Sequence, residues 1–362
     1  TTKVMTAILI LENCNLNDKV ICGYDAIVSV PVGYTNASLQ VGEEVSVKDL
    51  LYMLLIISAN DAANVLAEYA AGSIENFAKM MNDKAQELGC QNTNFVNPSG
   101  IHNKNHYSTA YDLSLIARYA MKNEKFREIV KTTTFTVEPT NKYNARAYTT
   151  INELLIMNNA EKPDNYYYEY ATGIKTGYTD SAKNCLIASA YKDNIELISV
   201  ILGALQTPEG VSQRYVDTKA LFNYAFDAYT IKKIKEKGSS YQEIVVPNAS
   251  RSTRNLNLVL ENDITVLVKK ENANKTLSPE VSINQNLQAP IEAGTVIGTI
   301  SYTAEDITYT TNLLAANDVK EETKLNIFLK LLLLIIVLFI FVKLNGINKK
   351  KTKRRKKVRR RR

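Results

Sequence analysis

The stretch GIKTGYTDSAKNCLIASA, residues 173–190, constrains the fold of this chain more than any other. Its apolar second half is followed by a polar Lys-Asp-Asn turn and then by the apolar run IELISVILGA, a pattern that predicts two adjacent buried strands. Lys175-Thr176-Gly177 precedes these strands, after a turn that contains Gly173. The sequence therefore places an amine, a hydroxyl and a glycine directly before a buried sheet.

Helical patterns lie on both sides of this stretch. Ser46 and Thr109 each stand three residues before an Asp and ahead of an apolar run, which is the capping-box signature of a helix start. The segments 74–88 and 211–229 have the apolar spacing of amphipathic helices. Helices that flank a short sheet indicate an α+β domain, which we predict over residues 1–235.

The C-terminal part of the chain changes character in three steps. Short β-type runs separated by turn residues predict a small all-β domain over 240–303. The polar composition of residues 304–324 predicts a linker. LNIFLKLLLLIIVLFIFVKL, residues 325–344, has the 20 residues that a helix needs to span a bilayer. The basic run that follows, 345–362, predicts a cytoplasmic tail by the positive-inside rule, so the preceding domains are expected on the other side of the membrane.

The net charge of +7 hides two opposite regions. Residues 348–362 hold 12 of the 44 Lys and Arg, and Lys324, Lys330 and Lys343 account for three more. Residues 1–323 are then left with 29 basic and 37 acidic side chains, a net charge of −8. A net acidic folded region argues against nucleic-acid binding, because such binding needs positive charge to neutralise phosphates.

Three short pieces carry candidate chemistry. They are Lys3 in an opening helical run, Ser58-Ala59-Asn60 after an apolar helix, and Lys175-Thr176-Gly177. Taken singly, Ser58 and Asn60 suggest only a helix cap, and Gly177 suggests a bulge. In this order they match the S-x-x-K, S-x-N and K-T-G set of penicillin-binding proteins and class A β-lactamases.

The chain resembles serine-type D-alanyl-D-alanine carboxypeptidases, the low-molecular-mass penicillin-binding proteins, over about 1–230. The resemblance is carried by four segments: TTKVMTAILILE, LLYMLLIISANDAANVLAEYAAGS, NFVNPSGIHNKNHYSTAYDLSLIARYA and GIKTGYTDSAKNCLIASA. It implies a β-lactamase/transpeptidase-like α+β domain with helices around an antiparallel sheet, a small all-β domain and one C-terminal transmembrane helix. It also implies removal of the terminal D-alanine of peptidoglycan stem peptides at a bacterial cell membrane, through an acyl-enzyme that β-lactams block, with no metal or organic cofactor.

The resemblance also implies roles for residues on the helices. Lys3 would be the general base, with its pKa lowered by neighbouring positive charge. Ser58 would relay a proton to the leaving amine, and Asn60 would hydrogen-bond Lys3 and the substrate backbone. The Ser of S-x-x-K falls at the position just before Thr1, so we expect the chain to begin one residue after its nucleophile and, as written, to lack acylation activity.

Further roles fall on the predicted sheet and the closing helix. Lys175 would supply positive potential, Thr176 would bind the terminal carboxylate of D-Ala-D-Ala, and Gly177 would let the substrate backbone approach closely. The backbone N–H of Tyr178 would contribute to the oxyanion hole. Arg214 would lie near the substrate carboxylate.

Two other functions remain open. A non-catalytic, membrane-anchored wall-binding protein would keep the fold and the peptide cleft without the nucleophile. A β-lactamase has less support, because the middle motif is Ser-Ala-Asn rather than Ser-Asp-Asn and Glu153-Leu154-Leu155 does not fit the E-x-x-L-N deacylation segment. His102 and His106 lie in a predicted loop without accompanying carboxylates, so we predict no metal site.

Overall fold

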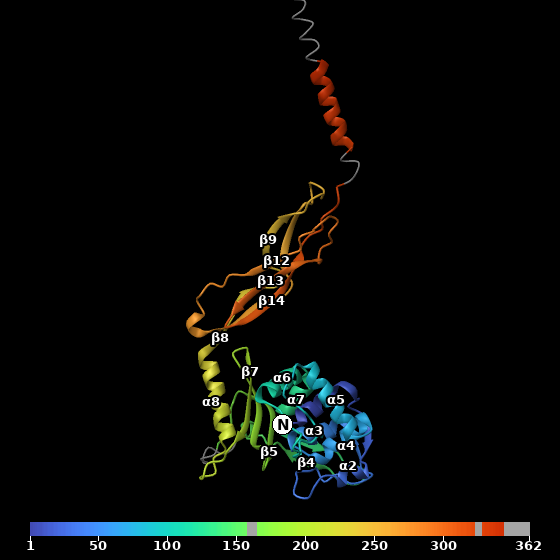
Figure 1. The fold of residues 1–362 in the computed structure, drawn as a ribbon, viewed down its shortest axis with the longest axis vertical. Helices are drawn as coiled ribbons and strands as arrows, with labels where there is room; N and C mark the ends of the chain where they lie inside the picture. The colour runs from blue at the N-terminus through green and yellow to red at the C-terminus, as the bar shows by residue number, and fades with distance from the viewer. Residues whose placement is uncertain (158–164, 323–327, 344–362) are drawn as a thin grey trace, which may run out of the picture. The chain divides into compact units, whose positions relative to one another are not determined.

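The computed structural model describes residues 1–157, 165–322 and 328–343. The chain forms two compact units, Thr1–Ala228 and Tyr229–Arg362 (Figure 1). Each unit has its own buried apolar core. The first unit holds the candidate site, and we describe it first.

The first unit has a helical part and a sheet. Its helices are α1 (Lys3–Asn13), α2 (Tyr24–Val28), α3 (Val47–Ile56), α4 (Asn60–Ala71), α5 (Ile74–Glu87), α6 (Ala110–Ala120), α7 (Glu124–Lys131) and α8 (Gln213–Ala228). A short 3-10 helix, η1, covers Glu153–Leu155. Helix α1 lies in the centre of the helical part, and every residue from Lys3 to Ile10 is buried. Burial of a lysine in its first turn is the feature that matters for function.

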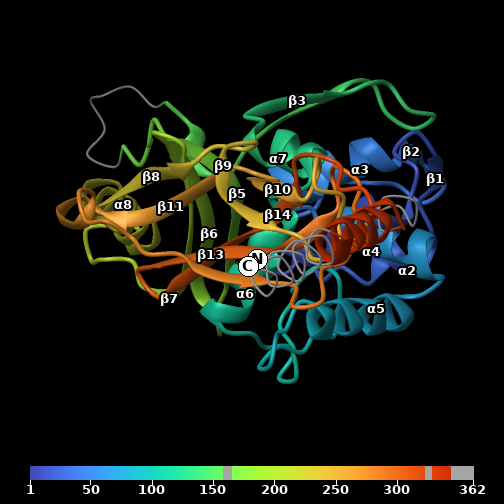
Figure 2. The same cartoon turned by 90° about the horizontal axis from the view of Figure 1, so that it is seen from above.

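The sheet of this unit has three antiparallel strands in the order β5 (Ala171–Thr179), β6 (Lys183–Lys192) and β7 (Ile195–Ala204). Helix α8 packs on β6 and β7, while α7 packs on β5. Figures 1 and 2 show the sheet between α8 on one side and the helical part on the other. The predicted α+β architecture with an antiparallel sheet is therefore confirmed.

Two small two-stranded ribbons complete the first unit. They are β1 (Lys19–Ile21) with β2 (Glu44–Ser46), and β3 (Thr134–Val137) with β4 (Arg146–Thr149).

The helix starts follow the capping signals in the sequence. The Ser46 hydroxyl accepts a hydrogen bond from Asp49 N at 3.0 Å, and the Thr109 hydroxyl accepts one from Asp112 N at 3.1 Å. Each bond supplies a partner for one of the N–H groups that the first turn of a helix leaves free. At the end of α4, Gly72 has a φ of 77°, which is the left-handed C-cap conformation that glycine adopts without strain.

The second unit contains a five-stranded sheet and a two-stranded ribbon. The sheet has the order β12 (Glu280–Ile283), β13 (Val296–Ala304), β14 (Ile307–Ala315), β10 (Asn255–Leu260) and β9 (Ser240–Val245). The ribbon pairs β8 (Tyr229–Lys235) with β11 (Ile264–Lys269), and η2 (Lys270–Asn272) follows it. Alternate side chains of these strands, such as Leu256, Leu258 and Val266, form its core. A C-terminal all-β domain is thus confirmed.

The boundaries of this domain along the chain differ from those expected from the sequence. Residues 229–235, predicted within the first domain, form β8 and belong to the second unit. The predicted polar linker 304–324 contains β14, in which Leu313 and Ala315 are buried. Thr and Lys make up four of the seven residues of β8, and Thr and Asn make up four of the nine residues of β14, so it is their pairing in the folded chain that identifies them as strands.

Residues 328–343 form a further helix, drawn in red in Figure 1, whose apolar side chains are exposed. In the part of the chain that the structure describes, no helix combines the length and the hydropathy required to cross a membrane. The predicted span 325–344 extends past the described residues at both ends, and the predicted basic tail 345–362 lies outside them.

Candidate active site

A cavity of about 870 Å³ opens in the first unit between the start of α1, the start of α4 and strand β5. Seven of the eight residues singled out in the sequence line it: Lys3, Ser58, Asn60, Thr176, Gly177, Tyr178 and Arg214. The eighth, Lys175, is only 1% exposed. Residues that are up to 211 positions apart in the chain therefore meet at one cleft, as the motif pattern predicted.

Lys3 lies in the first turn of α1 and is 4% exposed. Its Nζ donates to Asn60 Oδ1 at 2.7 Å and to the carbonyl oxygen of Ser99 at 2.6 Å. Burial, and not the neighbouring positive charge that the resemblance implies, lowers the pKa of Lys3 to about 7, against the opposing effect of the Asp61 carboxylate. A substantial share of the amine is therefore unprotonated at neutral pH, which a general base requires.

The Ser58-Ala59-Asn60 turn joins α3 to α4. Ser58 has a left-handed backbone, with φ at 63°, and it lines the cleft. Asn60 gives both its backbone N–H and its side-chain Nδ2 to the carbonyl oxygen of Thr35, at 3.0 and 2.9 Å. With Nδ2 held in this way, Oδ1 is the atom that faces Lys3.

Lys175 and its neighbours lie on β5, the strand nearest the start of α1. The Lys175 ammonium donates to the Thr176 carbonyl oxygen at 2.9 Å. Burial lowers the pKa of Lys175 well below its usual range, and the nearby positive charges of Lys3 and Arg214 lower it further. Among these basic side chains, the Arg214 guanidinium is the one that carries a permanent positive charge at the cleft, which suits a substrate with a carboxylate at its end.

Gly177 lies against the beginning of α1. A Cβ built on it would be 2.8 Å from the backbone nitrogen of Thr1. Arg214, on α8, donates from Nη1 to the Gly177 carbonyl oxygen at 3.3 Å, which places its guanidinium beside the strand. Tyr178 is exposed, and its hydroxyl donates to Asp180 at 3.0 Å.

The loop from 95 to 107 contributes residues that the motifs did not indicate. The Thr6 hydroxyl donates to the Pro98 carbonyl oxygen at 2.6 Å. Val96 N donates to His106 Nδ1 at 3.2 Å, so Nε2 carries the ring hydrogen and donates to the Thr2 hydroxyl at 2.9 Å. Burial lowers the pKa of His106 to about 4, which keeps the ring neutral. This loop and the Ser99 carbonyl together hold the first turn of α1 in place.

No group of three or more His, Cys, Asp or Glu that could hold a metal ion occurs among the described residues. His102 and His106 both line the cleft, and His106 is engaged with Thr2 and Val96. Beside these imidazoles the cleft presents the Lys3 amine, the Asn60 amide and the Arg214 guanidinium, together with several hydroxyls.

Comparison with known proteins agrees with this site. The family model described as D-alanyl-D-alanine carboxypeptidase matches residues 1–206, and the model described as penicillin-binding protein 5, C-terminal domain, matches 229–321. The D-alanyl-D-alanine carboxypeptidase DacF of Bacillus subtilis is 32% identical over 305 residues, which is 83% of this chain and 73% of DacF. DacC of Escherichia coli is 30% identical over 315 residues, 83% of this chain and 72% of DacC.

Solved structures show the same likeness. Penicillin-binding protein 5 from Haemophilus influenzae has a TM-score of 0.68 at 29% identity, covering 88% of this chain and 89% of that one. A peptidoglycan synthesis regulatory factor, PBP3, from Streptococcus pneumoniae has a TM-score of 0.72 at 25% identity, covering 88% and 91%. On this sequence, fold and cleft, the chain belongs to the family of serine-type D-alanyl-D-alanine carboxypeptidases.

Proposed function

We propose that the cleft removes the terminal D-alanine of a peptidoglycan stem peptide through an acyl-enzyme, with Lys3 as the general base. The observation that carries this is the buried Lys3 amine, whose pKa lies near 7 and which faces the cleft at the start of α1. A Ser at the position before Thr1 would be three residues from Lys3 and would share its helix face. Such a Ser would be the nucleophile.

The reaction proceeds in two stages. The Ser hydroxyl attacks the carbonyl carbon of the penultimate D-alanine while Lys3 takes its proton, and the backbone N–H of Tyr178 stabilises the oxyanion. Ser58 takes this proton from Lys3 and gives its own proton to the leaving amine, the C–N bond breaks, and free D-alanine departs, which leaves Lys3 unprotonated again. Water then hydrolyses the ester with Lys3 again as the base. A β-lactam enters the same first stage, but its amine stays attached.

The substrate is held mainly at its charged end. Thr176 would hydrogen-bond the terminal carboxylate, and Arg214 would supply positive potential around it. Lys175, whose pKa is lowered by burial, would add to this potential once the carboxylate is bound, because a nearby negative charge favours its protonated form. Asn60 would hold Lys3 and the substrate backbone, and Gly177 leaves room for that backbone beside β5. No step in this scheme uses a metal or an organic cofactor.

We also propose that residues 325–344 anchor the protein in a bacterial cell membrane as a single-pass helix. The exposed apolar side chains of 328–343 and the basic run 345–362 support this proposal. Residues 1–323 would then lie outside the cytoplasm and the C-terminus inside it. Protease treatment of intact cells is expected to digest the first unit and to spare an epitope tag at the C-terminus. If the protease digests neither the first unit nor the tag, the proposed topology is wrong.

Acylation by a fluorescent penicillin tests the catalytic proposal. We would compare the full chain in detergent with a Ser-extended chain, in which a Ser and a short leader precede Thr1, and with an Ala-extended control. Only the Ser-extended chain is expected to be labelled. If none is labelled while circular dichroism shows all three folded, the carboxypeptidase chemistry fails and the wall-binding alternative takes precedence.

The pH dependence of acylation follows from Lys3. Because the free amine is the active form and its pKa is about 7, the acylation rate of the Ser-extended chain is expected to rise with pH. It should rise close to tenfold per pH unit below about 6 and level off above about 8. Stopped-flow fluorescence with the penicillin in excess measures this, and a profile that is flat between these limits would exclude Lys3 as the titrating base.

A further inference from the structure

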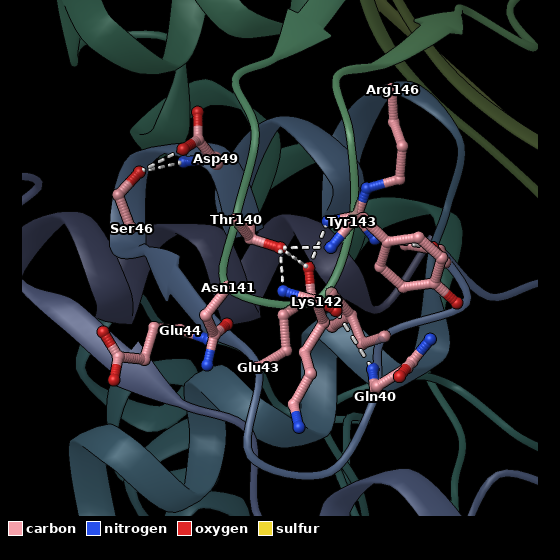
Figure 3. Close-up of polar contacts among 12 residues, drawn as sticks. Gln40, Glu43, Glu44, Ser46, Asp49, Thr140, Asn141, Lys142, Tyr143 and Arg146 are labelled. Carbon is pink, nitrogen blue, oxygen red and sulfur yellow. Dashed lines mark hydrogen bonds and ion pairs between the residues drawn. The ribbon is translucent and has the colours of Figure 1, made fainter.

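A buried ion pair joins the loop that follows α2 to the β3–β4 ribbon (Figure 3). Glu43 is fully buried, and its carboxylate pairs with the Arg146 guanidinium. The same carboxylate accepts hydrogen bonds from the Thr140 hydroxyl at 2.9 Å and from Gln40 N at 3.0 Å. Several donors offset the cost of removing a carboxylate from water, so this pair is bound firmly in one geometry.

The ribbon also forms hydrogen bonds with the loop at other points. Arg146 Nη1 and the Tyr148 hydroxyl both donate to the carbonyl oxygen of Ala37, at 3.5 and 3.2 Å. Asn141, at the tip of the ribbon, accepts from Glu44 N and donates to the Gly42 carbonyl oxygen, each at 2.9 Å. The loop segment 37–44 is therefore held along its length from one side.

From the other side the same loop is held by the start of α4. The Asp61 carboxylate, which is buried, accepts from Ala37 N at 2.9 Å and from Leu39 N at 3.0 Å. The Thr35 carbonyl oxygen accepts both N–H groups of Asn60. Asn60 in turn presents Oδ1 to Lys3. A continuous set of contacts thus runs from the ion pair, through the loop backbone, to the catalytic amine.

We propose that Glu43 and Arg146 are positioning residues for the general base: their ion pair clamps loop 35–44 so that Asn60 holds Lys3 in its reactive place. Neither Glu43 nor Arg146 lines the cleft, so the pair would act on catalysis indirectly, along the contacts of the loop. The proposal rests on the proposed function only in taking Lys3 as the base. Loosening the clamp lets water approach Lys3, and since burial is the main cause of its lowered pKa, that pKa should rise.

The central test substitutes Glu43→Gln in the full Ser-extended chain, with Arg127→Gln as the matched control. Arg127 forms an ion pair with Glu196 at 2.6 Å in the same unit, but both side chains are about a third exposed. Saturation kinetics with a fluorescent penicillin give the dissociation constant and the acylation rate constant separately. We expect Glu43→Gln to slow acylation about tenfold, to change the dissociation constant less than twofold, and to move the pH midpoint upward. Arg127→Gln should change none of these.

A loss of thermal stability with an unchanged acylation rate and pH midpoint would overturn the proposal, because a merely structural ion pair would produce that result. Since Glu43→Gln leaves a buried guanidinium without its anion, it could prevent folding. Arg146→Lys then serves instead: it keeps the charge pair, but one ammonium cannot also reach the Ala37 carbonyl oxygen. Arg146→Lys is expected to fold, to slow acylation less than Glu43→Gln does, and to raise the pH midpoint by a smaller amount. An acylation rate and pH midpoint equal to those of the parent would count against the clamp.

Direct titration of Lys3 separates this proposal from the proposed function. The ε-methylene of Lys3 can be followed by NMR in the full chain with isotope-labelled lysine, and Lys3→Met identifies its signal. An upward shift in Glu43→Gln supports the clamp whether or not the Ser-extended chain is acylated. An unshifted midpoint overturns the clamp even if acylation occurs.

Discussion

Lys3→Met in the Ser-extended chain is expected to slow acylation by a fluorescent penicillin about 10³-fold, a typical loss when a positioned general base is removed. Methionine keeps the length and most of the volume of lysine, so the packing around the first turn of α1 is largely retained. The proton of the attacking hydroxyl then has no acceptor within the cleft that replaces the amine. Lys79→Met is the control, because Lys79 is exposed on α5. The chain with this substitution should be labelled at the parental rate.

The stability of the same variant shows whether its inactivity reflects lost chemistry or lost structure. Lys3 has a pKa of about 7 in the fold and an ordinary value of 10.5, so between these pH values the unfolded chain binds more protons than the folded one. The free energy of unfolding therefore increases with pH across this window. Lys175 contributes in the same direction, since its pKa is also lowered.

Methionine at position 3 removes the first of these contributions. Between about pH 7 and 10, the midpoint temperature of thermal unfolding is then expected to rise less steeply with pH in the variant than in the parent. At pH 7 the midpoint temperature of the variant is not expected to fall below that of the parent. The Asn60 and Ser99 oxygens lose a donor, which limits any gain in stability. Labelling of Lys3→Met at the parental rate would show that another group is the base.

The candidate site residues can be proposed from the sequence because they occur in short, local patterns. Lys3 and Asn60 are each fixed by the helix they begin, and the K-T-G residues by one strand. Once the three motifs are matched, the fold brings them together, as the 2.7 Å contact of Lys3 with Asn60 shows. Helix starts such as Ser46 were equally local and were also predicted.

The supporting residues could not be predicted, because their roles depend on contacts across the fold. Glu43 and Arg146 are 103 positions apart, and neither belongs to a motif. Asp61 directly follows Asn60, so it could have been read as a helix-start residue, yet its partners are backbone N–H groups in a distant loop. The first six residues of β14, ITYTTN, are rich in Thr and predict a polar linker, whereas pairing with β13 and β10 makes the segment a strand.

Gly177→Ala is expected to reduce acylation of the Ser-extended chain about 100-fold, the scale of loss that a misplacement of about 1 Å produces. The added Cβ would lie 2.8 Å from the Thr1 backbone nitrogen, closer than real Cβ atoms approach another heavy atom. In the Ser-extended chain that nitrogen is part of the peptide bond between the added Ser and Thr1, and it cannot rotate away as a side chain would. Strand β5 and the start of α1 must therefore separate, which moves the nucleophile away from Thr176 and Tyr178.

Gly23→Ala is the control, because its added Cβ would meet only the end of the flexible Glu68 side chain, at 3.0 Å. It is expected to label at the parental rate. Gly177→Ala should still fold, since the strain falls on one contact between a strand and a helix end, and thermal unfolding checks this. The pH midpoint should stay near 7, because Lys3 keeps its partners Asn60 and Ser99. A folded Gly177→Ala chain that labels within twofold of the parent would show that β5 does not have to lie this close to the nucleophile.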